Sequence, residues 1–206
     1  MDLVRLDEAN SEEAAQVLTR AFQEDPFQSH IIPDPEKRRM LSPPFFSELF
    51  RYGVRVGEVW STDEFIKGLA VWLAANRDAH VDLLEEAGFQ QLSAIIGEEA
   101  FGRFTSFLDY LAPLRARVVP GPHWYTMILG VDPKHQCEGV GRSLLREIFR
   151  RADAEGAPCY LETTQPRNVP FYINSEFEVV HHGIEPKSAL QYWTFRRNPR
   201  GRSTSC

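Results

Sequence analysis

The hydrophobic positions near the N-terminus change from strand-like to helix-like spacing. Val4 and Leu6 alternate with charged residues, which predicts a short strand. Ser11 then stands before Glu12 and Glu13, a helix start with negative charge in its first turn. The apolar residues that follow recur at helical spacing: Ala14, Val17, Leu18, Ala21 and Phe22. The pattern predicts a strand followed by an amphipathic helix.

Prolines divide the next segment. They stand at positions 26, 33 and 35, and the pair Pro43–Pro44 interrupts the pattern again before the apolar run 45–54. Proline has no backbone N–H and its ring clashes with the preceding helical turn. We therefore expect two short helices here and not one long helix.

The middle of the chain contains strands and a helical insertion. Two runs rich in Val, Trp, Phe and Ile flank a polar turn at 61–64, which predicts a β-hairpin. Residues 81–118 carry apolar positions at helical spacing, with Gly97 as a joint. The segment 124–131, WYTMILGV, is too apolar to have a solvent face, so we expect it at the centre of a sheet.

The last third alternates between helix and strand. After a loop at 132–139, one apolar stripe predicts a helix: Val140, Leu144, Leu145, Ile148, Phe149 and Ala152. A strand at 159–163, a short helix at 168–175 and strands at 177–182 and 189–195 complete the list. We expect an α/β (α+β) fold with a single domain over residues 1–198 and a flexible tail over 199–206.

Composition narrows the class of protein. The 206 residues are 43% hydrophobic and 25% charged, as in globular proteins, and the net charge of -6 argues against nucleic acid or an anionic membrane as the main partner. Three scattered cysteines offer neither a disulfide framework nor a metal site. The N-terminus lacks the apolar stretch of a signal peptide. We expect a cytoplasmic protein without a metal and without membrane partners.

A glycine-rich turn points to a phosphate ligand. The pattern Gln136-x-x-Gly139-x-Gly141 lies between the buried strand and the helix, where backbone N–H groups can face a phosphate. A tight turn without a ligand is the alternative. A P-loop would need Gly at 136 and Lys at 142, and a dinucleotide fingerprint would need Gly at 144, which is Leu144.

Two segments give this turn a family context. GVDPKHQCEGVGRSLL (130–145) and YLETTQPRNVPFY (160–172) resemble the two core motifs of the GNAT superfamily of acetyl-CoA-dependent N-acetyltransferases. More narrowly, residues 123–141 and 157–172 are similar to puromycin N-acetyltransferase and its bacterial relatives. The resemblance implies a mixed, twisted sheet of about six to seven strands that splays after the fourth strand. Helices would flank the sheet, with the helical insertion before the central strand.

The resemblance also implies a site for acetyl-CoA in a core at about 123–180. Backbone groups of Leu129, Gly130 and Val131 would pair with the pantetheine arm. The pyrophosphate would be wrapped by Gln136, Cys137, Glu138, Gly139, Val140, Gly141 and Arg142. Asn168 and Tyr172 would lie at the thioester end.

The chain departs from the family pattern at two places. Cys137 and Glu138 replace residues that are usually small or basic, and Glu138 brings a carboxylate near the phosphates unless it points away. Where the family commonly has Gly-Phe, this chain has Glu176-Phe177. We therefore expect Asn174 to make that turn in a left-handed conformation.

Two residues are candidates for catalysis. By the resemblance, Tyr172 is the general acid that protonates the departing CoA thiolate; a half-buried aromatic residue is the alternative. Glu162 lies within a strand, where a carboxylate is costly unless it faces a cleft or a partner. It is either the general base for the acceptor amine or half of a structural ion pair, and a water chain could also take the proton.

These features predict an N-acetyltransferase that moves the acetyl group of acetyl-CoA to a primary amine of a small molecule by direct attack in a ternary complex. The acceptor would enter beside the insertion 81–118 and the hairpin near Trp60, and the Phe-rich face of the insertion suits an apolar or aromatic amine. A peptide or protein N-acetyltransferase and a non-catalytic acetyl-CoA sensor are the alternatives. A homodimer is left open.

Overall fold

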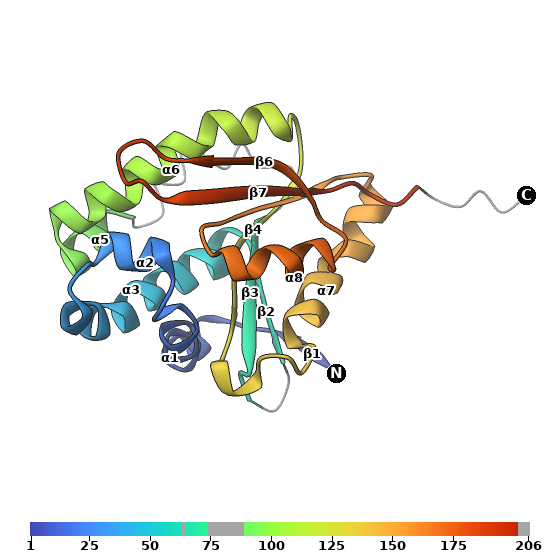
Figure 1. Cartoon of the computed structure of the whole chain (residues 1–206). Coiled ribbons are helices and arrows are strands. Elements are labelled where there is room, and N and C mark those ends of the chain that lie inside the picture. The colour runs from blue at the N-terminus through green and yellow to red at the C-terminus, as the bar shows by residue number, and fades with distance from the viewer. Residues whose placement is uncertain (63–64, 74–88, 202–206) are drawn as a thin grey trace, which may run out of the picture.

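The computed structural model describes residues 1–62, 65–73 and 89–201, and within them one mixed sheet organises the molecule (Figure 1). The strands are β1 (Leu3–Arg5), β2 (Glu58–Thr62), β3 (Gly68–Leu73), β4 (Trp124–Val131), β5 (Cys159–Thr163), β6 (Glu178–Ile184) and β7 (Gln191–Arg197). Their order in the seven-stranded sheet is β1-β2-β3-β4-β5-β7-β6. The α/β fold class is confirmed, and β4 is central as its apolar sequence predicts.

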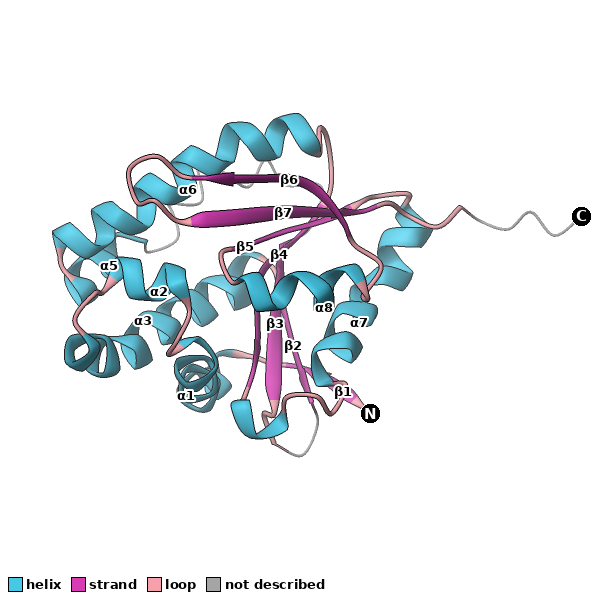
Figure 2. Ribbon diagram, viewed as in Figure 1, coloured by secondary structure: helices cyan, strands magenta, loops and turns pink. Residues whose placement is uncertain are grey.

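Helices cover both faces of this sheet (Figure 2). They are α1 (Ser11–Phe22), α2 (Pro26–Ile31), α3 (Pro35–Val56), α5 (Phe89–Ile96), α6 (Glu98–Val118), α7 (Val140–Glu155) and α8 (Val169–Ile173). Strand β3 shows the layering, because its side chains alternate between two cores. Leu69, Val71 and Leu73 pack with α1, α3, α5 and α6, whereas Ala70 and Trp72 pack with α7 and α8.

The sheet splits at its centre. Parallel strands β4 and β5 pair only through Trp124 with Cys159 and Tyr125 with Tyr160, although β4 continues to Val131. Beyond Tyr125 the strands diverge, and β7 and β6 continue the sheet on the far side of the split. The predicted splay after the fourth strand is confirmed.

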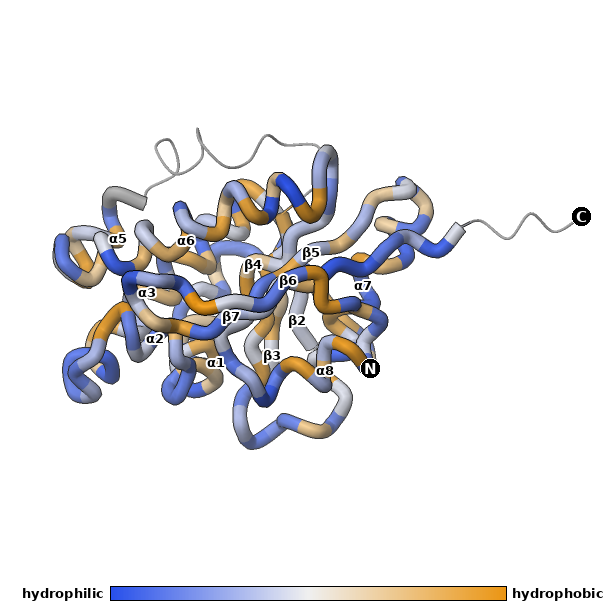
Figure 3. The backbone as a smooth tube through the Cα atoms, turned by 45° about the horizontal axis from the view of Figure 1, so that its top comes forward, coloured by the Kyte–Doolittle hydropathy of each residue, from blue (hydrophilic) through white to orange (hydrophobic). Residues whose placement is uncertain are grey.

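The helical insertion before β4 is also present. Helices α5 and α6 form its described part, and Gly97 joins them with a φ of +83°, a conformation that favours glycine. Residues 81–88 of the predicted insertion lie outside the described residues. Figure 3 shows hydrophobic positions along β3 and β4, while hydrophobic and hydrophilic positions alternate along the helices. In the described part of the chain, no helix is long and apolar enough to cross a membrane.

The expected break at Pro43–Pro44 is wrong, because both prolines lie inside α3. Each proline removes the hydrogen bond to the carbonyl four residues earlier, on Arg39 and Met40. Both of those residues are exposed, Met40 by 73%, so water can satisfy the two carbonyls. Burial of the apolar residues that follow offsets the cost. These are Phe45, Phe46, Leu49 and Phe50.

The turn after α8 also differs from the prediction. Asn174 is right-handed, with a φ of -68°, and Glu176 adopts the left-handed conformation with a φ of +74°. The Glu176 carboxylate contacts Arg197 at 3.2 Å and Arg200 at 3.0 Å. These contacts with two arginines accompany, and help to offset, the left-handed conformation of a residue other than glycine.

Candidate active site

The end of β4 presents its backbone to the split in the sheet. On one side Leu129, Gly130 and Val131 align with residues 68–70 of β3, and the other edge has no partner in β5. Gly130 also lets α1 pack closely, because a Cβ there would lie 2.6 Å from a Leu18 methyl carbon. The unpaired edge leaves backbone groups for an extended ligand such as the pantetheine arm.

The loop after β4 is held in place by its own side chains. Asp132 accepts a hydrogen bond from the N–H of Lys134 at 3.1 Å and forms an ion pair with Arg20 of α1 at 2.6 Å. The side-chain amide of Gln136 donates to the carbonyl of Val131 at 3.3 Å. The loop therefore leaves β4 in a fixed direction toward α7.

The start of α7 forms a cradle for an anion. Cys137 and Gly139 both have positive φ, +67° and +84°, and α7 begins at Val140 directly after them. The first N–H groups of a helix have no partner within the helix and carry partial positive charge. A Cβ on Gly141 would lie 3.0 Å from the ring of Phe171, so glycine keeps α7 close to α8. This cradle fits the pyrophosphate of acetyl-CoA.

The negative charge of Glu138, next to the predicted phosphate site, is compensated by neighbouring basic side chains. Its carboxylate lies 3.3 Å from His135 Nδ1 and 3.9 Å from Lys67 Nζ, so it faces neighbouring basic groups. Arg142 donates to the carbonyl of Asn174 at 3.4 Å and connects α7 to the end of α8. The predicted run Gln136–Arg142 thus forms one continuous loop and helix start at the split.

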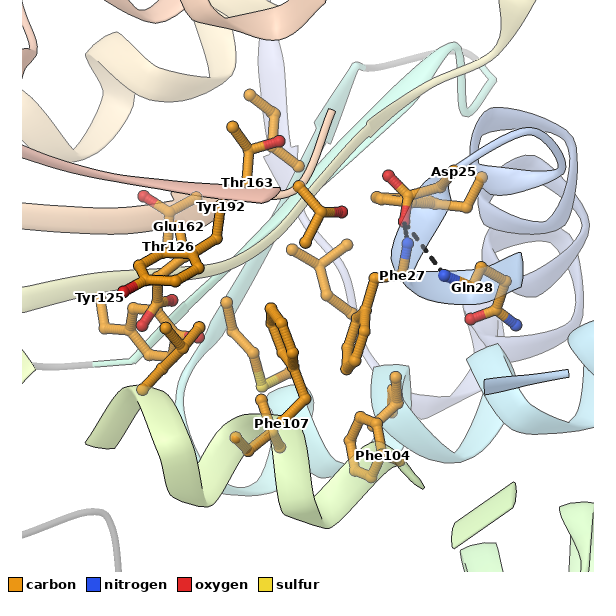
Figure 4. A pocket seen from close by; sticks show the side chains of 18 of the residues that line it. Asp25, Phe27, Gln28, Phe104, Phe107, Tyr125, Thr126, Glu162, Thr163 and Tyr192 are labelled. Carbon is orange, nitrogen blue, oxygen red and sulfur yellow. Dashed lines mark hydrogen bonds between the residues drawn. The ribbon is translucent and has the colours of Figure 1, made fainter. Parts of the chain in front are cut away.

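An apolar cavity of about 220 Å³ lies on the other face of the sheet, beside the split (Figure 4). Helices α1, α2, α3, α6 and α8 and strands β3, β4, β5 and β7 line it. Its apolar lining includes Phe27, Phe45, Phe104, Phe107, Leu111 and Met127. The structure thus brings the Phe-rich face of α6 to a cavity, although Phe101 packs beside Phe104 outside the lining. Trp60 was expected on this side and packs instead in the α7 core.

Tyr172 and Asn168 meet the cavity from the α8 side of the split. The Tyr172 side chain is buried and contacts the rings of Phe171, Phe177 and Phe195. Burial raises the pKa of its hydroxyl above the usual range, and the charge of Asp25 raises it further. The hydroxyl is therefore protonated at neutral pH, as a general acid must be.

Glu162 lines the opposite part of the cavity beside Arg115 of α6. The two side chains form an ion pair at 3.2 Å, and both are almost fully buried. The Arg115 guanidinium also lies over the ring of Tyr125, 4.2 Å from its centre. Burial acts to lower the pKa of Arg115, but the Glu162 carboxylate and the Tyr125 and Tyr160 rings raise it overall. The structure thus shows the ion pair that the sequence left as the alternative for Glu162.

Asp25 is a cavity residue that the sequence analysis missed. It is the N-cap of α2, and its Oδ1 accepts hydrogen bonds from the N–H groups of Phe27 at 2.9 Å and Gln28 at 3.2 Å. Burial raises the pKa of its carboxyl, against the opposing effects of these two bonds and of the charge of Arg167. The sequence signal was the pair Asp25–Pro26, a common helix start that reveals nothing about a cavity.

The structure offers little to a metal ion. Across residues 1–62, 65–73 and 89–201, no group of three His, Cys, Asp or Glu side chains is arranged to hold one. The expected absence of a metal stays a prediction. The backbone edge of β4 and the α7 cradle, in contrast, fit a thioester ligand that carries a pyrophosphate.

A sheet split at parallel strands, with an anion cradle at the helix after the fourth strand, defines the class of acetyl-CoA-dependent acetyltransferases. The chain belongs to the acetyltransferase (GNAT) family, whose model matches residues 58–174. It is 27% identical over 181 residues to an uncharacterized N-acetyltransferase of Schizosaccharomyces pombe, covering 84% of this chain and 72% of that protein. The predicted superfamily is confirmed, while the narrower likeness to puromycin N-acetyltransferase stays a prediction.

Solved structures share the fold over nearly the full chain. A Corynebacterium glutamicum structure described as histone acetyltransferase HPA2 and related acetyltransferase matches with a TM-score of 0.70 and 21% identity, covering 98% of both chains. Arylalkylamine N-acetyltransferase 2 from Aedes aegypti matches with a TM-score of 0.63 and 11% identity, covering 97% of this chain and 99% of that one. The protein is an N-acetyltransferase, and its family uses acetyl-CoA.

Proposed function

We propose that this N-acetyltransferase acetylates the primary amine of a small molecule. The observation that carries the proposal is the apolar cavity at the split, which Tyr172 and Asn168 line together with α2, α3 and α6. A volume of about 220 Å³ suits the body of a small amine, whereas a peptide or protein substrate needs an open groove.

In this proposal the reaction is a direct transfer in a ternary complex. The pantetheine arm lies along Leu129, Gly130 and Val131, and the loop Gln136–Arg142 holds the pyrophosphate. A backbone N–H of β4 meets the oxyanion that develops when the amine attacks the thioester carbonyl. Holding both reactants at the split replaces a bimolecular encounter by an oriented one.

Tyr172 is the proposed acid in the second half of the reaction. As the bond between carbon and sulfur breaks, its hydroxyl donates a proton to the thiolate. Because a thiolate is a fair leaving group, we expect this acid to contribute about 10-fold to 100-fold. The ion pair with Arg115 supports a structural role for Glu162, because the buried guanidinium already occupies its carboxylate.

The names of the structural neighbours support more than one acceptor. The Aedes aegypti protein is named for arylalkylamines, and the Corynebacterium glutamicum structure for a histone acetyltransferase. At these identities the likeness shows the fold alone. A peptide or protein acceptor therefore stays the second candidate, and the small apolar cavity favours the small amine.

The test is a release assay for the thiol of free CoA. The purified protein is incubated with acetyl-CoA and a panel of arylalkylamines, polyamines, amino acids, puromycin and peptides. We expect release that depends on a small amine, with the N-acetyl product seen by mass spectrometry. Release with peptides alone would favour the second candidate. Binding of acetyl-CoA without release across the panel would indicate a sensor and contradict the proposal.

A further inference from the structure

We propose that Asp25 binds the ammonium group of the acceptor and takes its proton, and that the cavity selects amines with one cationic group on an apolar body. The inference rests on the proposed function, because it names the residue and the substrate class of the same site. It depends on a comparison of Asp25 with two other carboxylates, Asp34 and Glu162.

Asp25 and Asp34 begin consecutive helices with the same local structure. Each is followed by proline, and each accepts two backbone hydrogen bonds through Oδ1. The distances are 2.9 and 3.2 Å for Asp25 and 2.9 and 3.0 Å for Asp34. Asp34 is exposed, while Asp25 lines the cavity. An exposed carboxylate such as that of Asp34 is therefore sufficient for capping. Capping does not explain why the Asp25 carboxylate lies in the apolar wall of a cavity.

The second oxygen of Asp25 is the group available to a ligand. Both hydrogen bonds use Oδ1, and within the described part of the chain Oδ2 receives none. Figure 4 shows the carboxylate at the edge of the cavity, above the rings of Phe104 and Phe107. A carboxylate that loses water on burial gains most from a cationic partner, and an acceptor ammonium would supply one.

Glu162 lies on the opposite side of the cavity from Asp25 and, unlike Asp25, forms an ion pair with an arginine of the protein. Arg115 contacts its carboxylate at 3.2 Å, so this end of the cavity already contains a cation. Because this carboxylate is already paired with Arg115, it gives a second ammonium or guanidinium on the ligand no uncompensated anion to bind. Asp109 of α6 also lines the cavity, but it is exposed, so water screens its charge. Phenyl rings and aliphatic side chains fill the space between.

Asp25 also lies near the proposed acid. The negative charge of Asp25 raises the pKa of the hydroxyl of Tyr172, which lines the same cavity. The ammonium gives one proton to Asp25, and the neutral amine then attacks the carbonyl carbon. The C–N bond forms, the C–S bond breaks, and the thiolate takes the Tyr172 proton. The second amine proton returns to Tyr172, and the Asp25 proton passes to water. The sum is one amide, one thiol and one released proton.

The experiment compares Asp25→Asn with Asp34→Asn. Asparagine caps a helix about as well as aspartate, so Asp25→Asn keeps the two hydrogen bonds and removes only the charge. Calorimetry measures binding of 2-phenylethylamine and of its neutral product N-acetyl-2-phenylethylamine. Steady-state assays with acetyl-CoA measure kcat/KM for 2-phenylethylamine and for agmatine, which has two cationic groups.

We expect Asp25→Asn to weaken binding of the amine and to lower its kcat/KM by about 30-fold or more. Binding of the neutral product and KM for acetyl-CoA should stay within about twofold, since the charge of Asp25 acts mainly on a cationic ligand. Asp34→Asn should behave like the wild type. The wild type should prefer 2-phenylethylamine to agmatine.

Each other outcome has a distinct meaning. Turnover that Asp25→Asn leaves unchanged would overturn the role of Asp25 and keep the proposed function. Amine binding that depends on Asp25 without turnover would keep the inference about binding and overturn the proposed function. Preference for agmatine would overturn the selection of single cations. Neither binding nor turnover with any amine would overturn both proposals.

Discussion

The two sides of the split sheet differ in the groups that they present: one presents mainly backbone groups and the other mainly side chains. On the proposed cofactor side, one contiguous segment from Leu129 to Arg142 supplies backbone groups and a helix start. On the proposed acceptor side, side chains from helices α1, α2, α3, α6 and α8 and from strands β3, β4, β5 and β7 meet around one cavity. A backbone site depends on local conformation, which a short motif encodes, whereas the acceptor cavity depends on residues that are distant in sequence.

The largest expected effect concerns the buried pair on the acceptor side. Glu162→Gln removes the carboxylate that faces the buried Arg115 guanidinium. We expect the free energy of unfolding to fall by about 3–5 kcal/mol, measured by urea denaturation. Glu99→Gln is the control, because Glu99 pairs with Arg103 but is 90% exposed, and should cost less than about 1 kcal/mol. Equal losses would show that burial of the pair is unimportant.

Tyr172→Phe tests the chemistry at the meeting point of the two sides. We expect kcat to fall by about 10-fold to 100-fold while both KM values change little, because the hydroxyl acts only as the thiolate leaves. Steady-state kinetics across pH measure this. An unchanged kcat at every pH would remove the acid role from Tyr172.

Phe107→Ala should affect only the acceptor side. The side chain lines the cavity, so we expect KM for the acceptor to rise about tenfold as apolar contact is lost, with KM for acetyl-CoA unchanged. Phe50→Ala is the matched control: Phe50 is fully buried outside the cavity lining and should cost about 3–5 kcal/mol of stability without changing acceptor KM. Identical kinetics of the two folded variants would contradict the assignment of the cavity.

Gly139→Ala should affect only the cofactor side. A Cβ at Gly139 has open space, but its φ of +84° would strain alanine by about 1–2 kcal/mol. We expect KM for acetyl-CoA to rise several-fold and acceptor KM to stay unchanged. Gly102→Ala provides the control, since Gly102 lies in α6 with open space and no positive φ, and alanine there should stabilise the helix by up to about 1 kcal/mol.

The smallest expected effects are opposite shifts of Tm with pH. Burial raises the pKa of Asp25, which Arg167 and Tyr172 face, so the folded state binds this proton more tightly than the unfolded state. Asp25 therefore costs stability as pH rises from about 4 through its folded pKa. Asp25→Asn should have the higher Tm at pH 7, with the difference vanishing near pH 3.

Asp34 has the opposite sign. The hydrogen bond from the Lys37 N–H lowers the pKa of its carboxyl, so its contribution is present above about pH 4 and lost as pH falls through the folded pKa. Asp34→Asn should lower Tm at pH 7 and not at low pH. Thermal scans at both pH values check the pair, and shifts of the same sign would show that the two caps do not differ.

Much of the fold could be predicted because hydrophobic periodicity reports directly on burial. The apolar run of β4, the stripe of α7 and the joint at Gly97 follow from it. The errors occurred where distant contacts override local preference. Exposed carbonyls and a buried aromatic face let α3 continue through Pro43–Pro44, and two arginines accompany the left-handed Glu176.

The candidate site divides in the same way. The turn between β4 and α7 could be predicted from the sequence, because its glycines and helix start depend on local conformation, while its role in binding the cofactor stays a prediction. Arg115 gave no such signal, since an arginine in an amphipathic helix is usually on the solvent side and only the packing of α6 over β5 buries it beside Glu162.

The sequence by itself determined the strands, the amphipathic helices and the glycine-rich turn before α7, since each depends on neighbours within a few residues. Only the tertiary structure decided which carboxylate lines the cavity. Asp25–Pro26 and Asp34–Pro35 are the same dipeptide and form the same type of helix N-cap. They differ because the start of α2 lines a cavity and the start of α3 faces solvent. This difference in environment shifts the pKa values of the two carboxyl groups in opposite directions.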